Sequence, residues 1–290
     1  MKRIASRMLC ILLLLSLLLS LTACGKPETQ LEKTAGYLQA QVAEPGAASI
    51  GGDWLIFGLA RSDIKVSQKY FDTYYKNVEA AVREKNGILS ERKYTEYSRT
   101  VLALTAIGKD PASVAGFNLL RPLADFEQVA KQGINGTIFA LLALDSGNYE
   151  IPENPDAAVQ ATRQMYVDEL LARELPDGGW TLTGGEADVD ITAMTLQALA
   201  KYREQSEVEA AVERGLAVLS SLQEQDGGYT SWGFEQQRIG RTGDRGADGT
   251  WRSAGRRALR EERHHRRRCA SALRAGKRRV RACAGRQRRR

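Results

Sequence analysis

The chain has 290 residues, of which 43% are hydrophobic, and a formal net charge of +7. This length and hydrophobic content suffice for a packed core, which excludes a wholly disordered chain. Residues 236–290 contain 19 arginines, one lysine and four acidic residues, a net charge of +16, so residues 1–235 carry −9. The chain is therefore an acidic protein with a basic appendage, and its overall charge does not predict a nucleic-acid-binding protein.

The N-terminus has the pattern of an export signal. Lys2, Arg3 and Arg7 precede an apolar run over residues 8–21, which is too short for a membrane span but suits the apolar region of a signal peptide. The run ends at Leu21-Thr22-Ala23-Cys24, which resembles the lipobox of bacterial lipoproteins. This resemblance implies a signal peptide over residues 1–23 and a lipid anchor at Cys24. The alternatives are an ordinary signal peptide or an uncleaved anchor in which the cysteine has no role.

The lipoprotein interpretation gives an order of segments. Residues 24–44 are the lipidated cysteine and a tether, and residues 45–235 are the folded domain, on the extracytoplasmic face of the cell membrane. Residues 25–268 contain no cysteine, so the domain depends on its hydrophobic core and not on disulfides.

The region after the tether has helical periodicity, with short Gly, Pro and Asp segments between the periodic runs. No alternating strand pattern is evident. The sequence predicts an all-α domain in which consecutive helices pack as antiparallel pairs. The predicted helices cover residues 30–43, 53–61, 66–86, 94–107, 112–131, 136–145, 155–174, 190–203 and 206–223.

The helices also repeat one another. Small-residue apolar segments begin at Ser98, Gly136 and Thr192, at intervals of roughly 38 and 56 residues. A second motif occurs twice, as Pro176-Asp-Gly-Gly-Trp180 and as Gln225-Asp-Gly-Gly-Tyr229. Glycines that accept positive φ would end one helix there and place an aromatic side chain in the next layer. Repeats of this length indicate stacked helix pairs.

These motifs resemble the repeat of squalene and oxidosqualene cyclases, in which Gln-x-x-Asp-Gly-Gly or Ser precedes Trp; related repeats occur in protein prenyltransferase β subunits. The first copy departs from that pattern with Glu174 in place of Gln, and the second with Tyr229 in place of Trp. The segment around Asp188-Val-Asp190-Ile-Thr192, with residues 132–141, is similar to bacterial surface proteins that carry the repeat and to the cobalamin carriers intrinsic factor and transcobalamin. The resemblance covers residues 45–235 and implies an α/α toroid of helix-pair repeats, truncated at its C-terminus.

The sharpest catalytic candidates are Asp188 and Asp190, because Asp188-Val-Asp190-Ile-Thr-Ala resembles the Asp-x-Asp-Asp-Thr-Ala motif of class II terpene cyclases. In that family the middle aspartate protonates an alkene, which requires an unusually strong acid. The third aspartate of the motif is Ile191 in this chain. The alternatives are that one of the two aspartates caps the helix that begins near Ile191, or that Asp188 and Asp190 contact a polar ligand; of these we expect capping.

Other enzyme classes and cofactors are disfavoured. Prenyltransferases hold zinc with Asp, Cys and His, but both histidines, His264 and His265, lie in the basic appendage. The domain has no glycine loop for phosphate and no histidine for a nucleophile–histidine pair. We therefore expect no metal and no cofactor.

Several further residues are candidates for ligand contact. Thr192 follows the two aspartates, and Asn135 lies in the segment similar to the surface proteins and cobalamin carriers. Aromatic side chains could line a cavity for an apolar or corrinoid ligand, although each is more often part of the core. These aromatic residues are Trp54, Phe57, Tyr97, Phe139, Trp180 and Trp232.

The basic appendage is predicted to be a misread frame. Periodicity is lost after Glu235, and taking the second and third bases of each codon with the first base of the next permits another small-residue helix over residues 237–251. The same shift permits a helix and a Gly-Gly-aromatic turn over residues 268–280. We expect a disordered tail and an unclosed ring with exposed apolar faces. The alternatives are an arm for nucleic acid or anionic polymers, or a basic membrane-surface segment.

Three functions follow from the sequence. The first is a non-enzymatic surface lipoprotein, membrane-bound through its lipid and without a nucleic-acid partner, whose toroid binds a small apolar molecule or a surface polymer or is a structural module. The second is a terpenoid cyclase that uses Asp188 and Asp190. The third is a corrinoid-binding protein.

Overall fold

The computed structural model describes residues 28–231 and 234–236, and these residues are mostly helical. The all-α prediction is confirmed. The predicted signal peptide, Cys24, Trp232 and the appendage from residue 237 onwards lie outside the described residues. Within the described ranges, no helix is long and apolar enough to cross a membrane.

The first helices lie close to their predicted positions. Helix α2 (Gln30–Gln41) begins with a capping box, in which the Thr29 hydroxyl accepts from Glu32 N and the Glu32 carboxylate accepts from Thr29 N. The predicted helix over 53–61 is a π-helix, η1 (Ile50–Trp54), that continues as α3 (Leu55–Ala60). Helix α4 (Gln68–Glu84) lies within the predicted range of residues 66–86 and is two residues shorter at each end.

The next segment contains an error of prediction. Helix α5 (Tyr94–Ala106) is as expected, but residues 112–131 do not form one helix. A turn with positive φ at Ala115 and Gly116 joins Val114 to Phe117, and only a short 3-10 helix η2 (Arg121–Ala124) and α6 (Phe126–Ala130) follow. A helix cannot pass through two consecutive left-handed residues.

The following two helices differ from the prediction in opposite directions. Helix α7 (Ile134–Ser146) extends beyond the expected 136–145, whereas α8 (Arg163–Ala172) occupies only the second half of 155–174. Residues 151–162 form a loop, in which the Asn154 amide donates to Arg121 O and the Asn154 carbonyl accepts from the Arg121 side chain. The loop thus uses its polar groups to bind η2 instead of continuing a helix.

The last elements are helices and one hairpin. Helix α9 (Val189–Leu199) ends in a 3-10 turn η3 (Ala200–Tyr202), and α10 (Ser206–Leu222) follows. Strand β1 (Tyr229–Ser231) pairs antiparallel with β2 (Phe234–Gln236). The sequence did not predict this hairpin, because three residues are too few to show an alternating pattern.

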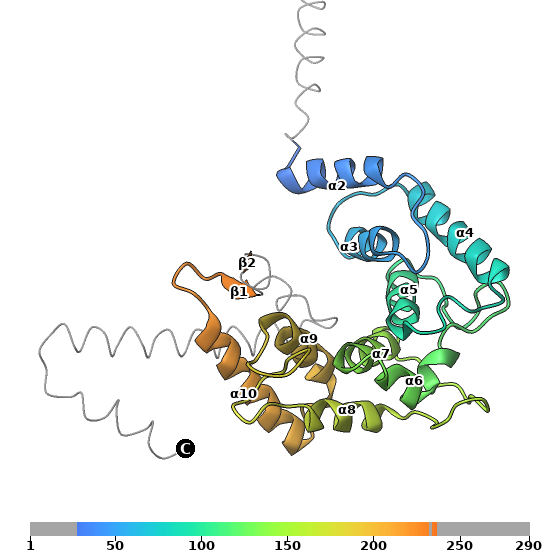
Figure 1. Cartoon of the computed structure of the whole chain (residues 1–290). Helices are drawn as coiled ribbons and strands as arrows, with labels where there is room; N and C mark the ends of the chain where they lie inside the picture. The colour runs from blue at the N-terminus through green and yellow to red at the C-terminus, as the bar shows by residue number, and fades with distance from the viewer. Residues whose placement is uncertain (1–27, 232–233, 237–290) are drawn as a thin grey trace, which may run out of the picture.

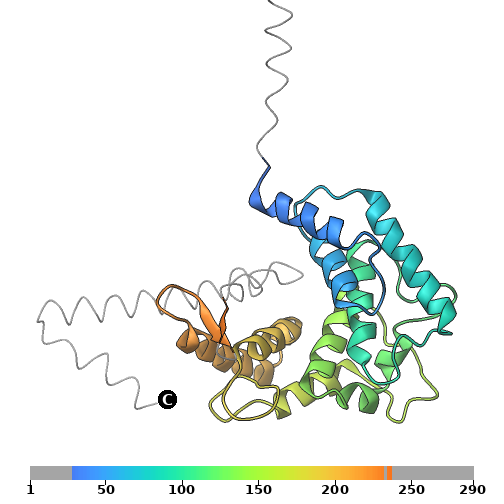
Figure 2. The ribbon, with the colours of Figure 1, turned by 45° about the horizontal axis from the view of Figure 1, so that its top comes forward.

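The helices follow one another along an arc (Figures 1 and 2). Figure 1 shows α3, α5, α7 and α9 along the inner, concave side, with α4, α6, α8 and α10 on the outer side. Helix α5 packs against both α3 and α7, and α7 packs against α9. One continuous hydrophobic core fills the space between the two rows, from Ile56 of α3 to Leu216 of α10.

The inner helices run parallel to one another. Arg99 in the second turn of α5 bonds Asp53 at the start of α3, and Thr95 N donates to Gln132 Oε1 just before α7. At the opposite end, the hydroxyls of Thr105 and Tyr149 bond near the ends of α5 and α7, and the Tyr202 hydroxyl after α9 donates to Asp145. Equivalent positions on these helices therefore lie at the same height on the concave side.

Candidate functional site

The Asp-Gly-Gly-Trp motif forms a turn that is fastened to the next inner helix. Trp180 N–H donates to the Thr192 hydroxyl at 2.9 Å, and this hydroxyl donates to Trp180 O at 3.1 Å. The Trp180 indole N–H donates to Leu170 O at 2.7 Å, and both Trp180 and Thr192 are fully buried. Two of the predicted ligand-contact residues therefore lie inside the core and hold α8, the turn and α9 together.

The two glycines of this motif have separate reasons to be glycine. Gly178 and Gly179 have φ of +87° and +77°, which side chains rarely adopt. A Cβ at Gly179 would also lie 3.0 Å from Ala187 Cβ and 3.1 Å from Thr192 Oγ1. The turn therefore needs both a left-handed backbone and close approach to α9.

The second motif copy forms a similar turn with the same two backbone hydrogen bonds, although Gly228, unlike Gly179, does not have a positive φ. Glu224 N donates to Gly228 O and Gly227 N donates to Glu224 O, as Leu175 N donates to Gly179 O and Gly178 N to Leu175 O in the first copy. Tyr229 replaces the tryptophan, is 4% exposed and packs beside Val189 and Ala193 of α9. The sequence repeat is thus a structural repeat at these two turns.

The two aspartates at the start of α9 have different positions. Asp188 is the N-cap, and its Oδ1 accepts from Ile191 N at 2.9 Å, so the expectation of capping is confirmed. Asp190 lies in the first turn and is partly exposed, and it takes part in a side-chain or electrostatic interaction. Asp188 and Asp190 therefore have different positions: Asp188 caps the N-terminus of α9, whereas Asp190, the residue proposed to be the acid, lies in the first turn.

Two further candidates are in different surroundings. Tyr97 is 3% exposed in the core, and its hydroxyl accepts from Ser90 N at 3.4 Å. Asn135 is partly exposed in the first turn of α7, and its Oδ1 is buried without a hydrogen-bond partner in the described part of the chain. An acceptor in that condition is normally satisfied by a donor, from the protein, water or a ligand.

Partly exposed residues form one stripe along α7 and along α9, and part of the same pattern along α5. On α7 they are Asn135, Phe139, Leu142 and Ser146, with Asp145 beside the last, and every other residue from 134 to 146 is buried. A spacing of four, three and four residues places side chains on one helix face. On α9 the partly exposed residues 190, 194 and 197 have the same spacing after the N-cap residue. On α5, residues 95, 99 and 106 lie at equivalent positions and are partly exposed, whereas Leu102 is buried and residues 94, 96 and 105 are also partly exposed.

Three aromatic rings belong to this concave face. Trp54 lies 6.0 Å from Phe57 and 5.6 Å from Phe139, measured between ring centroids. Because α3 and α7 flank α5, the contact between Trp54 and Phe139 crosses the concave side of α5. These three rings are partly exposed, in contrast to Tyr97 and Trp180. Sequence alone did not separate the two groups.

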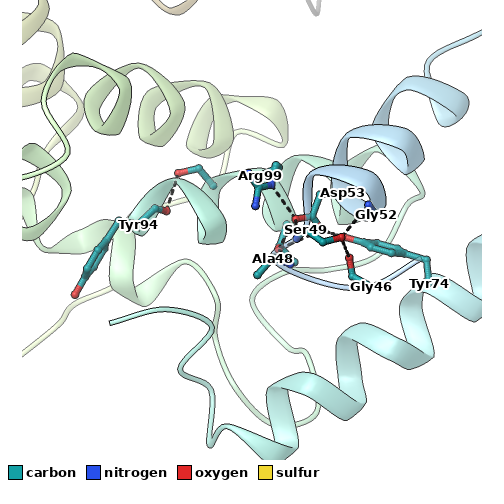
Figure 3. A network of polar contacts seen from close by, with 10 residues as sticks. Gly46, Ala48, Ser49, Gly52, Asp53, Tyr74, Tyr94 and Arg99 are labelled. Carbon is teal, nitrogen blue, oxygen red and sulfur yellow. Dashed lines mark hydrogen bonds and ion pairs between the residues drawn. The ribbon is translucent and has the colours of Figure 1, made fainter. Parts of the chain in front are cut away.

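A buried carboxylate lies in η1, next to Arg99 of α5 (Figure 3). Asp53 is fully buried, and its carboxylate accepts from the Tyr74 hydroxyl at 2.6 Å, Arg99 Nε at 3.1 Å and Ser49 N at 3.2 Å. The Thr100 hydroxyl lies 3.3 Å from Oδ2. Four donors from three separate segments thus surround this one side chain.

The backbone around Asp53 is unusually tight. Ser49 caps the π-helix by accepting from Gly52 N at 2.8 Å, and a Cβ at Gly52 would lie 2.0 Å from Gly46 O. π-helical turns are rare and are frequently found at functional sites. Asp53 was not among the site residues predicted from the sequence. Its position is marked in the sequence only by a lone acidic residue after Gly51-Gly52, immediately before an apolar run.

Burial changes the ionisation of this group. Desolvation raises the pKa of Asp53 to about 6, although the hydrogen bonds from Tyr74 and Arg99 and the charge of Arg99 favour the ionised form. Arg99 and Asp53 form an ion pair in which the side chains are 13% and 0% exposed. The pair is therefore largely withdrawn from solvent, and breaking it would leave a buried charge uncompensated.

Metal binding finds no support among residues 28–231 and 234–236, since no group of three or more His, Cys, Asp or Glu side chains is placed to hold an ion there. Comparisons with protein-family models, with curated proteins and with solved structures find no match to this chain.

Proposed function

We propose that the chain is an extracytoplasmic protein, held at the membrane by lipid on Cys24, whose residues 45–235 form part of an α/α toroid that binds a small apolar molecule without catalysis. The lipobox-like Leu21-Thr22-Ala23-Cys24 supports the anchor. The arc of parallel inner helices and the repeated turns at Trp180 and Tyr229 support the toroid.

The observation that carries the binding function is the repeated stripe on α5, α7 and α9. On α7 and α9 its members are partly exposed while their neighbours are almost all buried, and on α5 residues 95, 99 and 106 follow the same spacing. Three rings, Trp54, Phe57 and Phe139, lie on this face, and small-molecule sites are typically concave, apolar and provided with few polar groups.

A non-enzymatic function is favoured because the motif residues that suggest cyclase chemistry have structural contacts. Asp188 caps α9, and Thr192 fastens the Trp180 turn. The terpenoid-cyclase alternative then rests on Asp190 alone, without the third aspartate of the motif. A cyclase would lose all turnover in Asp190→Asn, whereas a binding protein has no turnover to lose.

The binding function can be tested with phenylbutanol, a neutral compound with one ring. The full-length chain is reconstituted in phosphatidylcholine nanodiscs, and the heat of binding is measured against protein-free discs. We expect saturable binding that is weakened in Phe139→Ala. Phe71→Ala makes the same change at a partly buried ring on the outer helix α4 and should leave binding unchanged. Equal effects of the two substitutions would contradict the proposal, and a spectral shift of added cobalamin would instead favour the corrinoid alternative.

A further inference from the structure

The second turns of the inner helices place four side chains at one height on the concave face. Arg99, Phe139 and Met194 each lie six residues after the N-cap of their helix, namely Lys93, Gly133 and Asp188. Trp54 joins this layer through its contact with Phe139. This register places three large apolar side chains in the same layer of the inner helices as one arginine.

Arg99 is the one cation among the first three stripe positions of α5, α7 and α9. Its Nε donates to Asp53, while neither Nη atom has a hydrogen bond in the described part of the chain. The Nη atoms are also not among the buried unpaired atoms, so they remain accessible to solvent or ligand. Guanidinium groups in this condition are suited to bind a planar carboxylate through two N–H donors.

Asp53 fixes the direction of the guanidinium. Its carboxylate is held by Tyr74, Ser49 and Thr100, none of which belongs to the concave stripe. Asp53 therefore holds the Arg99 guanidinium through its Nε atom before a ligand binds. Because the side chain is already ordered, the entropic cost of ligand binding is lower. The Asp53 charge also offsets part of the Arg99 charge, which disfavours a ligand with more than one negative charge.

We propose that the ligand is a monocarboxylate with an apolar body, whose carboxylate binds the Nη groups of Arg99 while the body packs on Trp54, Phe139 and Met194. This inference rests on the proposed function and specifies its ligand class. A neutral molecule of the same shape would fill the apolar layer but leave Arg99 unused.

The test compares phenylbutyrate with phenylbutanol on the full-length chain in phosphatidylcholine nanodiscs at neutral pH. We expect phenylbutyrate to bind about tenfold more tightly, as one charge-assisted pair contributes. Arg99→Gln should remove this difference, and Arg83→Gln, at an exposed arginine of α4, should preserve it. The preference should also decline with added salt, because screening weakens only the charged contact.

A second variant keeps the test decisive where Arg99→Gln fails to fold. Asp53→Asn retains the shape of the side chain but removes the competing charge, so phenylbutyrate should bind several-fold more tightly while phenylbutanol binding is unchanged. A purely structural arginine would give no such gain. Equal affinity for the two compounds in the unmodified chain overturns the carboxylate inference alone, whereas loss of the Phe139 dependence overturns the proposed function as well.

Discussion

Two buried threonines at equivalent positions should respond in opposite directions to the same substitution. Thr192 and Thr137 each lie four residues after the N-cap of an inner helix, and both are fully buried. The Thr192 hydroxyl bonds the backbone of Trp180, whereas the Thr137 hydroxyl has no hydrogen-bond partner in the described part of the chain. Valine removes the hydroxyl at nearly constant volume.

The magnitudes follow from the lost contacts. Thr192→Val leaves Trp180 N–H buried and unpaired, while Trp180 O still accepts from Asp188 N. An unpaired buried donor costs about 1–3 kcal/mol, so the free energy of unfolding should decrease by about 2 kcal/mol. Thr137→Val removes an unpaired buried hydroxyl and should increase the free energy of unfolding by about 1 kcal/mol.

Urea unfolding of the full-length chain, followed by circular dichroism, measures both effects. With a slope of about 3 kcal/mol per molar urea, Thr192→Val should lower the midpoint by about 0.7 M and Thr137→Val should raise it by about 0.3 M. Equal destabilisation by the two substitutions would refute the reasoning, because it would mean that the unpaired Thr137 hydroxyl stabilises the fold as much as the Thr192 hydroxyl that bonds Trp180.

Two other predictions concern the Trp180 turn and Asp53. Gly179→Ala should destabilise the chain by at least about 1 kcal/mol more than Gly184→Ala, since both have positive φ but only Gly179 is crowded by α9; thermal unfolding of the pair measures this difference. Because folding raises the pKa of Asp53 from 3.8 to about 6, the folded state binds the proton more tightly. Stability should therefore fall by on the order of 2–3 kcal/mol as pH rises from about 4 to about 6, and Asp53→Asn should lose this part of the slope in urea unfolding at several pH values.

The long periodic helices were predictable because their apolar spacing is local information. Residues 94–106, 134–146 and 206–222 were located to within two residues for this reason. The segment 112–131 failed because apolar residues there pack from a loop, and the warning signals were Gly116 and Pro122. These two turn-forming residues were better evidence for the structure of this segment than its apolar composition.

The candidate site was less predictable, because it depends on contacts between distant segments. Asp53 is bonded by Tyr74 and Arg99, which lie 21 and 46 residues further along the chain. The capping of α9 by Asp188 was foreseen because a cap is local. The sequence of one helix does not specify how neighbouring helices cross. This crossing decides which aromatic rings face the concave side.

The central claim is that one face of each inner helix is open on the concave side and binds a ligand there. Single cysteines in α7 test it most directly, in the full-length chain with all four native cysteines, Cys10, Cys24, Cys269 and Cys283, changed to serine. Phe139→Cys and Leu142→Cys should react with a maleimide at least about tenfold faster than Ile138→Cys and Leu141→Cys, whose parent side chains are fully buried. Phenylbutanol should slow only the first pair. Similar rates at all four positions, or no protection by phenylbutanol, would contradict the account.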